Sequence, residues 1–315
     1  MIQLSIIIPL HNEINYIDLL MQSVLQNDGI DKEIFLVDGG STDGTIEKIE
    51  RYEKQYPNIT LVNNERQFVS YGFNKAFPLT KGKYITLMGA HAEYPMGFFN
   101  IGISFLESNE CDVVGGPLKQ LGKTLTGKAI AYCMSSKFGV GGTEFRTETK
   151  KMYVDSVAFA IYKREVFENT GLLDEDLIRN QDDELHYRIN AAGYRILMVP
   201  EMSCNYYVRN SIKKLFLQYF GYGLYKPLVL NKVKQSIRFR HIIPFLFVLY
   251  IISLPIAIWF PIWTIPLLLY MIIDIYISFF NNLNLKEKFY CLIIFPTLHF
   301  AYGLGFLFGL RKLID

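Results

Sequence analysis

The sequence predicts a mixed α/β domain built on a mostly parallel sheet, followed by apolar helices that enter a membrane. Short apolar β runs alternate with segments of helical periodicity over residues 4–88, a pattern typical of a sheet covered by helices on both faces. Long apolar runs then fill residues 242–310. The chain has 315 residues and a mean hydropathy of +0.17, and the apolar excess lies in that C-terminal part.

Strands and helices of the first part follow from local periodicity. The strands are predicted at 4–10, 34–37, 59–62 and 84–88, and the helices at 14–26, 45–56 and 67–77. The strands are continuous apolar runs, as expected where a parallel sheet is buried on both faces. Ligands of such sheets bind at the carboxyl ends of the strands, so the polar residues that follow each strand are candidate site residues.

Two apolar runs predict a membrane region. Residues 242–280 contain Asp274 as their only charge, and residues 289–310 are uncharged. About 20 apolar residues cross a bilayer, so the first run can form a hairpin that turns at Trp259–Trp263, where tryptophans suit an interface. A very hydrophobic water-soluble helical domain is the alternative. The predicted division is a first domain at 1–208, an interfacial segment at 209–241 and a membrane region of about three apolar segments at 242–315.

The segment at 209–241 is basic and aromatic. No acidic residue lies between Glu201 and Asp274. The basic residues in this interval are Arg209, Lys213, Lys214, Lys226, Lys232, Lys234, Arg238 and Arg240. Such a stretch before a membrane span predicts a helix on an anionic cytoplasmic leaflet. Nucleic-acid binding is the competing interpretation of this basic patch. We do not favour it, because the following membrane spans already account for a basic flanking segment. The apolar N-terminal run lacks a basic start and ends at Pro9, so it predicts a strand rather than a signal peptide and a cytosolic first domain.

Polar loops follow three of the predicted strands. They run from Pro9 to Glu13, from Asp38 to Gly44 and from Gly89 to Glu93. Each loop alone could be structural, since its residues are ordinary helix caps and turn formers. Their joint placement at one sheet edge predicts a nucleotide pocket, where Asp38 accepts hydrogen bonds from a base or ribose and glycines allow close approach. His91 or Glu93 could ligate a metal that bridges a diphosphate.

An acidic cluster stands at the head of another predicted helix. Asp182, Asp183 and Glu184 follow Asn180 and Gln181. The structural interpretation is that anions favour the first turn of a helix. The functional one is that a carboxylate in a cleft serves as a general base.

These motifs together resemble family 2 glycosyltransferases of GT-A fold. Ile6–Glu13 and Val37–Thr45 match the opening of that family, Asn74 and Lys81–Ile85 match the helix and strand before its DxD metal motif, and Asn180–Glu184 matches its ED motif. The resemblance implies an inverting transferase that uses a nucleotide-sugar donor, most simply a UDP-sugar, and a divalent cation, Mn²⁺ or Mg²⁺. It assigns the base to Asp182 and the metal to His91. It assigns the donor site to Pro9, His11, Asn12, Glu13, Asp38, Gly40, Asn74, Gly89 and Ala90.

Two departures from the family pattern bear on this assignment. The DxD motif is Gly89-Ala90-His91, so its first acid is missing and its last is a histidine, which suits Mn²⁺ better than Mg²⁺. Gln181 replaces the Glu of the ED pair. The Q-x-x-R-W motif of processive synthases is also missing, which predicts transfer of a single sugar.

The C-terminal tail, residues 299–306, resembles bacterial enzymes that extend lipid-linked exopolysaccharide units. This resemblance implies a polyprenyl-diphosphate-linked glycan acceptor, other polysaccharide-assembly proteins as partners, and a multi-pass protein of the inner membrane with a cytoplasmic catalytic domain. A lipid or a teichoic-acid-like acceptor is one alternative, and a catalytically weak membrane scaffold is another. Residues 281–288 are expected in the cytosol, residues 289–310 as a broken or re-entrant segment, and Asp315 at a cytoplasmic C-terminus.

Overall fold

The computed structural model describes residues 2–233 and 238–313 and divides the chain into two compact units. Unit 1 comprises Met1–Lys119 and Glu148–Tyr206, and unit 2 comprises Gln120–Thr147 and Tyr207–Asp315. The segment 120–147, which the sequence places in the first domain, therefore belongs with the C-terminal helices. Its helix α5 (Leu125–Ser135) packs against the last helix of the chain, a contact between segments more than 150 residues apart that no local pattern encodes.

Unit 1 is built on an eight-stranded mixed sheet with the order β3-β2-β1-β4-β9-β6-β10-β8. The strands are β1 (Leu4–Leu10), β2 (Lys32–Asp38), β3 (Ile59–Asn63), β4 (Tyr84–Leu87), β6 (Val113–Gly116), β8 (Met152–Tyr153), β9 (Ala158–Lys163) and β10 (Ile196–Met198). The neighbours β3, β2, β1 and β4 are all parallel, whereas β9 runs antiparallel between β4 and β6. A second sheet has the order β5-β11-β7, with β5 (Ala92–Glu93), β7 (Leu118–Leu121) and β11 (Cys204–Tyr207).

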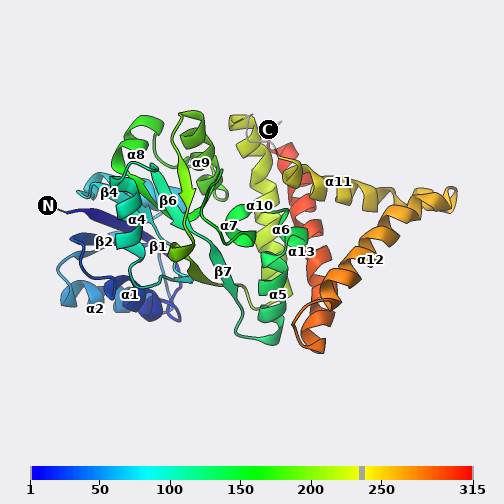
Figure 1. Cartoon of the computed structure of the whole chain (residues 1–315), viewed down its shortest axis with the longest axis horizontal. Helices are drawn as coiled ribbons and strands as arrows, with labels where there is room; N and C mark the ends of the chain where they lie inside the picture. Colours follow the sequence, from blue (N-terminus) through cyan, green and yellow to red (C-terminus); the bar gives the residue numbers. More distant parts are fainter. Residues whose placement is uncertain (1, 234–237, 314–315) are drawn as a thin grey trace. The chain divides into compact units, whose positions relative to one another are not determined.

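Helices flank the large sheet of unit 1 (Figure 1). They are α1 (Ile17–Leu25), α2 (Thr45–Gln55), α3 (Val69–Ala76), α4 (Phe98–Glu107), α8 (Arg164–Thr170) and α9 (Gln181–Ala191). α3 packs on β1 and β2, and α4 packs on β6 and β9. The continuous apolar strands predicted from the sequence are the core, because Ile6, Ile7, Ile8 and Leu36 are fully buried. The predicted α/β class is confirmed, with a sheet that is parallel from β3 to β4 and mixed beyond β4.

Unit 2 is helical apart from the strand residues at its start. Its helices are α5, α6 (Lys137–Val140), α7 (Glu144–Thr147), α10 (Ile212–Lys232), α11 (Phe239–Ser253), α12 (Ile265–Phe279) and α13 (Leu285–Arg311), with 3₁₀ helices at Leu254–Ile258 and Pro261–Thr264. Among the described residues, three stretches are long and apolar enough to cross a membrane: Phe239–Ile258, Pro261–Phe279 and Leu285–Arg311. The predicted hairpin with its turn at Trp259–Trp263 is present (Figure 1).

The third apolar segment differs from the prediction of a broken helix. α13 runs without interruption through Pro296. Its glycines do not break it. They let neighbouring backbones approach, since a Cβ at Gly305 or Gly309 would collide with carbonyls of α10, and one at Gly303 with a carbonyl of α11. The predicted interfacial segment, residues 209–241, contains α10 and the first residues of α11, and its place at a membrane surface stays a prediction. Lys234 and Asp315 lie outside the described residues.

Candidate active site

The loops after β1 and β2 are joined by hydrogen bonds at the carboxyl edge of the sheet. The Asn12 amide N–H donates to Ser41 Oγ at 2.8 Å, and the Thr42 N–H donates to Asn12 Oδ1 at 2.8 Å. The Glu13 N–H donates to Thr45 Oγ1 at 2.9 Å. His11 Nδ1 lies 3.0 Å from the Gly39 carbonyl oxygen. Residues that lie about 30 positions apart are thus held as one rigid rim, as the parallel pairing of β1 with β2 requires.

Asp38 is buried in this rim with one carboxylate oxygen available. Its Oδ2 accepts from the N–H groups of Gly40 at 2.8 Å and Ser41 at 3.0 Å. The turn requires a positive φ of 76° at Gly40, which glycine adopts without strain. Asp38 Oδ1 is buried and has no hydrogen-bond partner in the described part of the chain. A buried acceptor without a partner costs about 1–3 kcal/mol, so a ligand N–H or O–H at this place would be favoured.

Glu13 and His91 connect the first loop to the one after β4. Glu13 Oε1 lies 3.1 Å from His91 Nε2, and the Tyr16 ring packs edge-on against the imidazole at 4.3 Å between centroids. Glu13 Oε2 is buried and lacks a partner among the described residues. The described residues hold no cluster of three or more His, Cys, Asp or Glu side chains fit for a metal. The pair nevertheless suits a cation that takes its other ligands from a diphosphate, because imidazole nitrogen and carboxylate oxygen are both Mn²⁺ ligands.

Gly89 has an aromatic ring where the side chain of an acid would lie. A Cβ built on Gly89 would come within 2.5 Å of Phe159 Cε1. Phe159 holds a positive φ of 51°, which is rare for a bulky residue. The Tyr94 hydroxyl accepts from the Gly89 N–H at 2.9 Å. The Phe159 ring therefore occupies the space that the side chain of the missing DxD acid would need. The neighbouring residue, Ala90, is buried.

The acidic cluster at the start of α9 divides into different environments. Asn180 precedes the helix in the left-handed conformation, with a φ of 62°. Asp182 is exposed, Asp183 is half-buried and Glu184 is buried. Glu184 is held by Arg188 through bonds of 2.6 Å from Nε and 2.8 Å from Nη2. Glu184 is thus a structural anion, and Asp182 is the most solvent-exposed carboxylate of the cluster.

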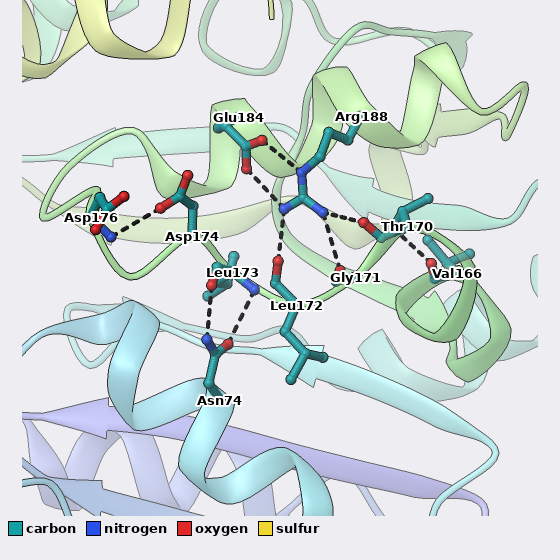
Figure 2. Close-up of polar contacts among 10 residues, drawn as sticks. All are labelled: Asn74, Val166, Thr170, Gly171, Leu172, Leu173, Asp174, Asp176, Glu184 and Arg188. Carbon is teal, nitrogen blue, oxygen red and sulfur yellow. Dashed lines mark hydrogen bonds and ion pairs between the residues drawn. The ribbon is translucent and has the colours of Figure 1, made fainter. Parts of the chain in front are cut away.

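Arg188 and Asn74 together hold the segment between α8 and α9 (Figure 2). The Arg188 guanidinium donates to the carbonyl oxygens of Thr170 and, at 2.7 Å, of Leu172. The Asn74 amide donates to the Leu173 carbonyl at 2.8 Å and accepts from its N–H at 3.1 Å.

A further bond of 3.0 Å from Asn74 Nδ2 reaches Glu175 Oε1, so both amide hydrogens of Asn74 are engaged. The sequence assigned Asn74 to the donor site. The structure engages its amide with Leu173 and Glu175, which is a positioning role, and its assignment to the donor site stays a prediction. Only tertiary contact reveals this role, because Leu173 lies 99 residues further along the chain.

A buried histidine lies one turn after Asp182 and was not recognised from the sequence. His186 Nδ1 lies 2.9 Å from Ser156 Oγ, and Nε2 lies 2.8 Å from the Tyr162 hydroxyl. Burial lowers the pKa of His186 to about 4, against the opposing effect of the Asp183 charge. Burial, followed by the Asp182 charge, raises the pKa of the Tyr162 phenol. A neutral polar chain thus lies beneath the first turn of α9, within electrostatic reach of Asp182.

The chain is similar to known glycosyltransferases. The model of the family described as "Glycosyl transferase family 2" matches residues 5–171, more than half of the chain. The chain belongs to glycosyltransferase family 2. It is 33% identical over 221 residues to "Succinoglycan biosynthesis protein ExoA" of Rhizobium meliloti, covering 69% of this chain and 67% of that protein.

A second relative is archaeal. "Dolichyl N-acetyl-alpha-D-glucosaminyl phosphate 3-beta-D-2,3-diacetamido-2,3-dideoxy-beta-D-glucuronosyltransferase" of Methanococcus voltae is 28% identical over 256 residues, covering 78% of this chain and 79% of that protein. A solved structure, "Mannosyltransferase PcManGT from Pyrobaculum calidifontis in complex with GDP-Man and Mn2+", superposes with a TM-score of 0.68 at 17% identity. It covers 98% of this chain and 87% of that one, and it shows that this family 2 glycosyltransferase has the GT-A fold.

Proposed function

We propose that this glycosyltransferase moves one sugar from a nucleotide-sugar, a UDP-sugar, to a polyprenyl-diphosphate-linked glycan during cell-surface polysaccharide synthesis, with inversion at the anomeric carbon. The observation that carries the proposal is the rim where three loops meet. It offers a free buried oxygen on Asp38 beside a Glu13–His91 pair. These groups match the needs of a nucleoside and of a metal-bound diphosphate.

The donor half of the site would work by positioning. Asp38 Oδ1 accepts a hydrogen bond from the base or the ribose, and the backbone around Gly40 lies close enough to contact the nucleoside. Pro9, His11 and Asn12 would form the wall beside it, and Gly89 and Ala90 would form the floor. His91 and Glu13 would hold a divalent cation, Mn²⁺ or Mg²⁺, which stabilises the charge of the departing diphosphate.

The acceptor half of the site would use Asp182. Its carboxylate takes the proton of the acceptor hydroxyl, and that oxygen then attacks the anomeric carbon from the face opposite the diphosphate. Inversion follows from this single displacement. Exposure at the head of α9 suits Asp182 to this task, whereas Glu184 is committed to Arg188.

The acceptor and the location are inferred from the relatives and from unit 2. One relative is named for succinoglycan biosynthesis and another for a dolichyl-phosphate sugar acceptor. We place the enzyme at the cytoplasmic face of the inner membrane, where α10 lies on the anionic leaflet and other polysaccharide-assembly proteins act on the same glycan. A lipid or teichoic-acid-like acceptor would use the same site.

One observation favours a second function, a membrane scaffold with weak catalysis. The Phe159 ring leaves no room for an acid at position 89, so the metal site has fewer carboxylates than the family motif. The test is donor hydrolysis and glycan transfer by purified protein with UDP- and GDP-sugars and Mn²⁺, with Asp182→Asn as the matched inactive variant. Turnover that this variant abolishes supports the transferase. UDP binding without any turnover supports the scaffold.

A further inference from the structure

The three apolar stretches of unit 2 form a triangle (Figure 1). At one corner the start of α11 meets the end of α13, where the rings of Phe245 and Phe306 lie 5.1 Å apart. At a second corner the end of α12 meets the start of α13, where the rings of Phe279 and Phe289 lie 5.4 Å apart. The third corner is the turn between α11 and α12. α13 is therefore the base of the triangle, and the hairpin stands on both of its ends.

The dimensions of the triangle follow from the helical rise. With 1.5 Å per residue, the base from Phe289 to Phe306 is roughly 26 Å, the α11 side to Phe260 roughly 22 Å and the α12 side from Trp263 roughly 24 Å. The turn then stands roughly 19 Å from α13. The hydrocarbon core of a bilayer is about 30 Å thick. A hairpin based on a surface helix would thus end inside the core, past its middle and short of the far face.

If α13 crossed the membrane, two lysines of the neighbouring helix α10 would be placed inside the bilayer. α10 runs parallel to α13, since the Gly305 contact is with Phe220 and the Gly309 contact is with Leu224. Lys213 and Lys214, both exposed, lie about one and a half to two turns before Phe220 and so beside the middle of α13. If α13 spanned the bilayer, these lysines would lie near its centre, at about 2.5–3.5 kcal/mol each. With α13 along the surface, they remain at the headgroups.

The turn of the hairpin satisfies its own polar groups. The Trp263 indole N–H donates to Ser253 Oγ at 2.9 Å, and the Tyr250 hydroxyl donates to the Trp263 carbonyl at 2.8 Å. The Leu267 N–H donates back to the same hydroxyl at 3.1 Å. Internal bonding of this kind is what irregular backbone needs where water is absent.

The surfaces of the triangle agree with this placement. The most exposed side chains of the apolar part of α13 are Phe289, Ile293 and Phe308, which lie along one stripe of the helix. Between these stretches lies a largely apolar cavity of about 430 Å³, whose lining includes Phe247 and Met271 together with the polar side chains of Tyr270 and Asp274. Contact of these two largely apolar surfaces with lipid acyl chains is favourable, whereas their contact with water is unfavourable.

We propose that α13 lies along the cytosolic surface of the membrane and that the α11–α12 hairpin enters the bilayer as a re-entrant wedge, so that none of the three apolar stretches of the described chain crosses the membrane. In this arrangement the apolar surface of unit 2 contacts the acyl chains of the cytosolic leaflet. The turn of the hairpin reaches the acyl chains of the opposite leaflet next to the bilayer midplane. The proposal uses the membrane location given under the proposed function and is independent of the sugar chemistry. It replaces the expected multi-pass topology with attachment from one side.

The depth of the wedge in the bilayer can be measured by the fluorescence of its natural tryptophans, without any substitution. Trp259 and Trp263 are the only tryptophans of the chain, and both are at the turn. In vesicles of phosphatidylcholine brominated at defined depths, their fluorescence should be quenched most by bromines deep in the acyl chains. Strongest quenching by bromines next to the headgroups would place the turn at an interface and overturn the re-entrant wedge.

Cysteine labelling tests the base of the triangle in intact bacterial cells. Asn282→Cys and Leu313→Cys flank α13, and Met96→Cys on unit 1 is the cytosolic control, because all three positions are exposed. The four natural cysteines are buried, so background is low. We expect an impermeant maleimide to label all three only after permeabilisation. Labelling of Leu313→Cys in intact cells would show that α13 crosses. Absence of bromine quenching, with glycosyl transfer intact, would refute membrane insertion and leave the transferase standing.

Discussion

Asp38→Asn offers the sharpest test of the donor site. The asparagine can keep one oxygen toward the N–H groups of Gly40 and Ser41, whose bonds to Asp38 measure 2.8 and 3.0 Å. Its NH₂ group then replaces the free Oδ1, so an acceptor becomes a donor where a ligand donor is expected. Loss of a hydrogen bond to a charged group is worth about 1.5–3 kcal/mol. At 1.4 kcal/mol per factor of ten, UDP affinity should fall roughly 10- to 150-fold.

The assay is titration calorimetry with UDP and Mn²⁺ on purified protein, with thermal unfolding to verify the fold. Asp43→Asn is the matched control, because it removes the same charge from the same loop. Asp43 bonds only inward, to the Thr45 N–H and hydroxyl and to the Ile14 N–H. The control should lose about 0.5–1.5 kcal/mol of stability through weaker hydrogen bonds to Thr45 and Ile14, but keep its UDP affinity. Asp38→Asn with UDP affinity within twofold of the unaltered protein would refute the assignment of Asp38 to the nucleoside.

Other predictions address the general base, the metal, the buried histidine His186 and the ion pair between Arg188 and Glu184. Asp182→Asn should cut transfer by about 10²-fold or more with UDP binding unchanged, and near-normal transfer would move the base elsewhere. His91→Ala should weaken UDP binding only when Mn²⁺ is present; equal affinities with and without EDTA in both proteins would contradict the metal assignment. Because the native pKa of His186 is lowered to about 4 from 6.5, the unfolded state takes up the proton first. Acidification from pH 6.5 to 4 should therefore remove about 3 kcal/mol of stability, and His186→Gln should flatten the dependence of Tm on pH. Arg188→Ala should destabilise the fold by about 3–5 kcal/mol by leaving Glu184 buried and unpaired, whereas Arg66→Ala at an exposed pair should cost under about 1 kcal/mol.

The sequence by itself determined the local structure of unit 1 and which polar residues follow its parallel strands. β1 has the predicted bounds, Leu4–Leu10, because a continuous apolar run has one stable place in a parallel sheet. Asp38 and Glu13 could be predicted as rim residues because parallel strands end at a common edge. The hairpin of unit 2 could be predicted because its length and apolarity are local properties.

The contacts between residues that are distant in the sequence were decided by the tertiary structure alone. Neither the antiparallel β9 between β4 and β6 nor the Phe159 ring beside Gly89 has a local signal, because these contacts join segments that lie far apart in the sequence. Asn74 has the right sequence neighbours for a donor site, yet its amide is used by Leu173. The glycines of α13 suggested interruption by propensity, but close backbone packing with α10 and α11 stabilises a continuous helix there. Periodicity specifies which face of an element is apolar, and only the assembled fold specifies which partner covers that face.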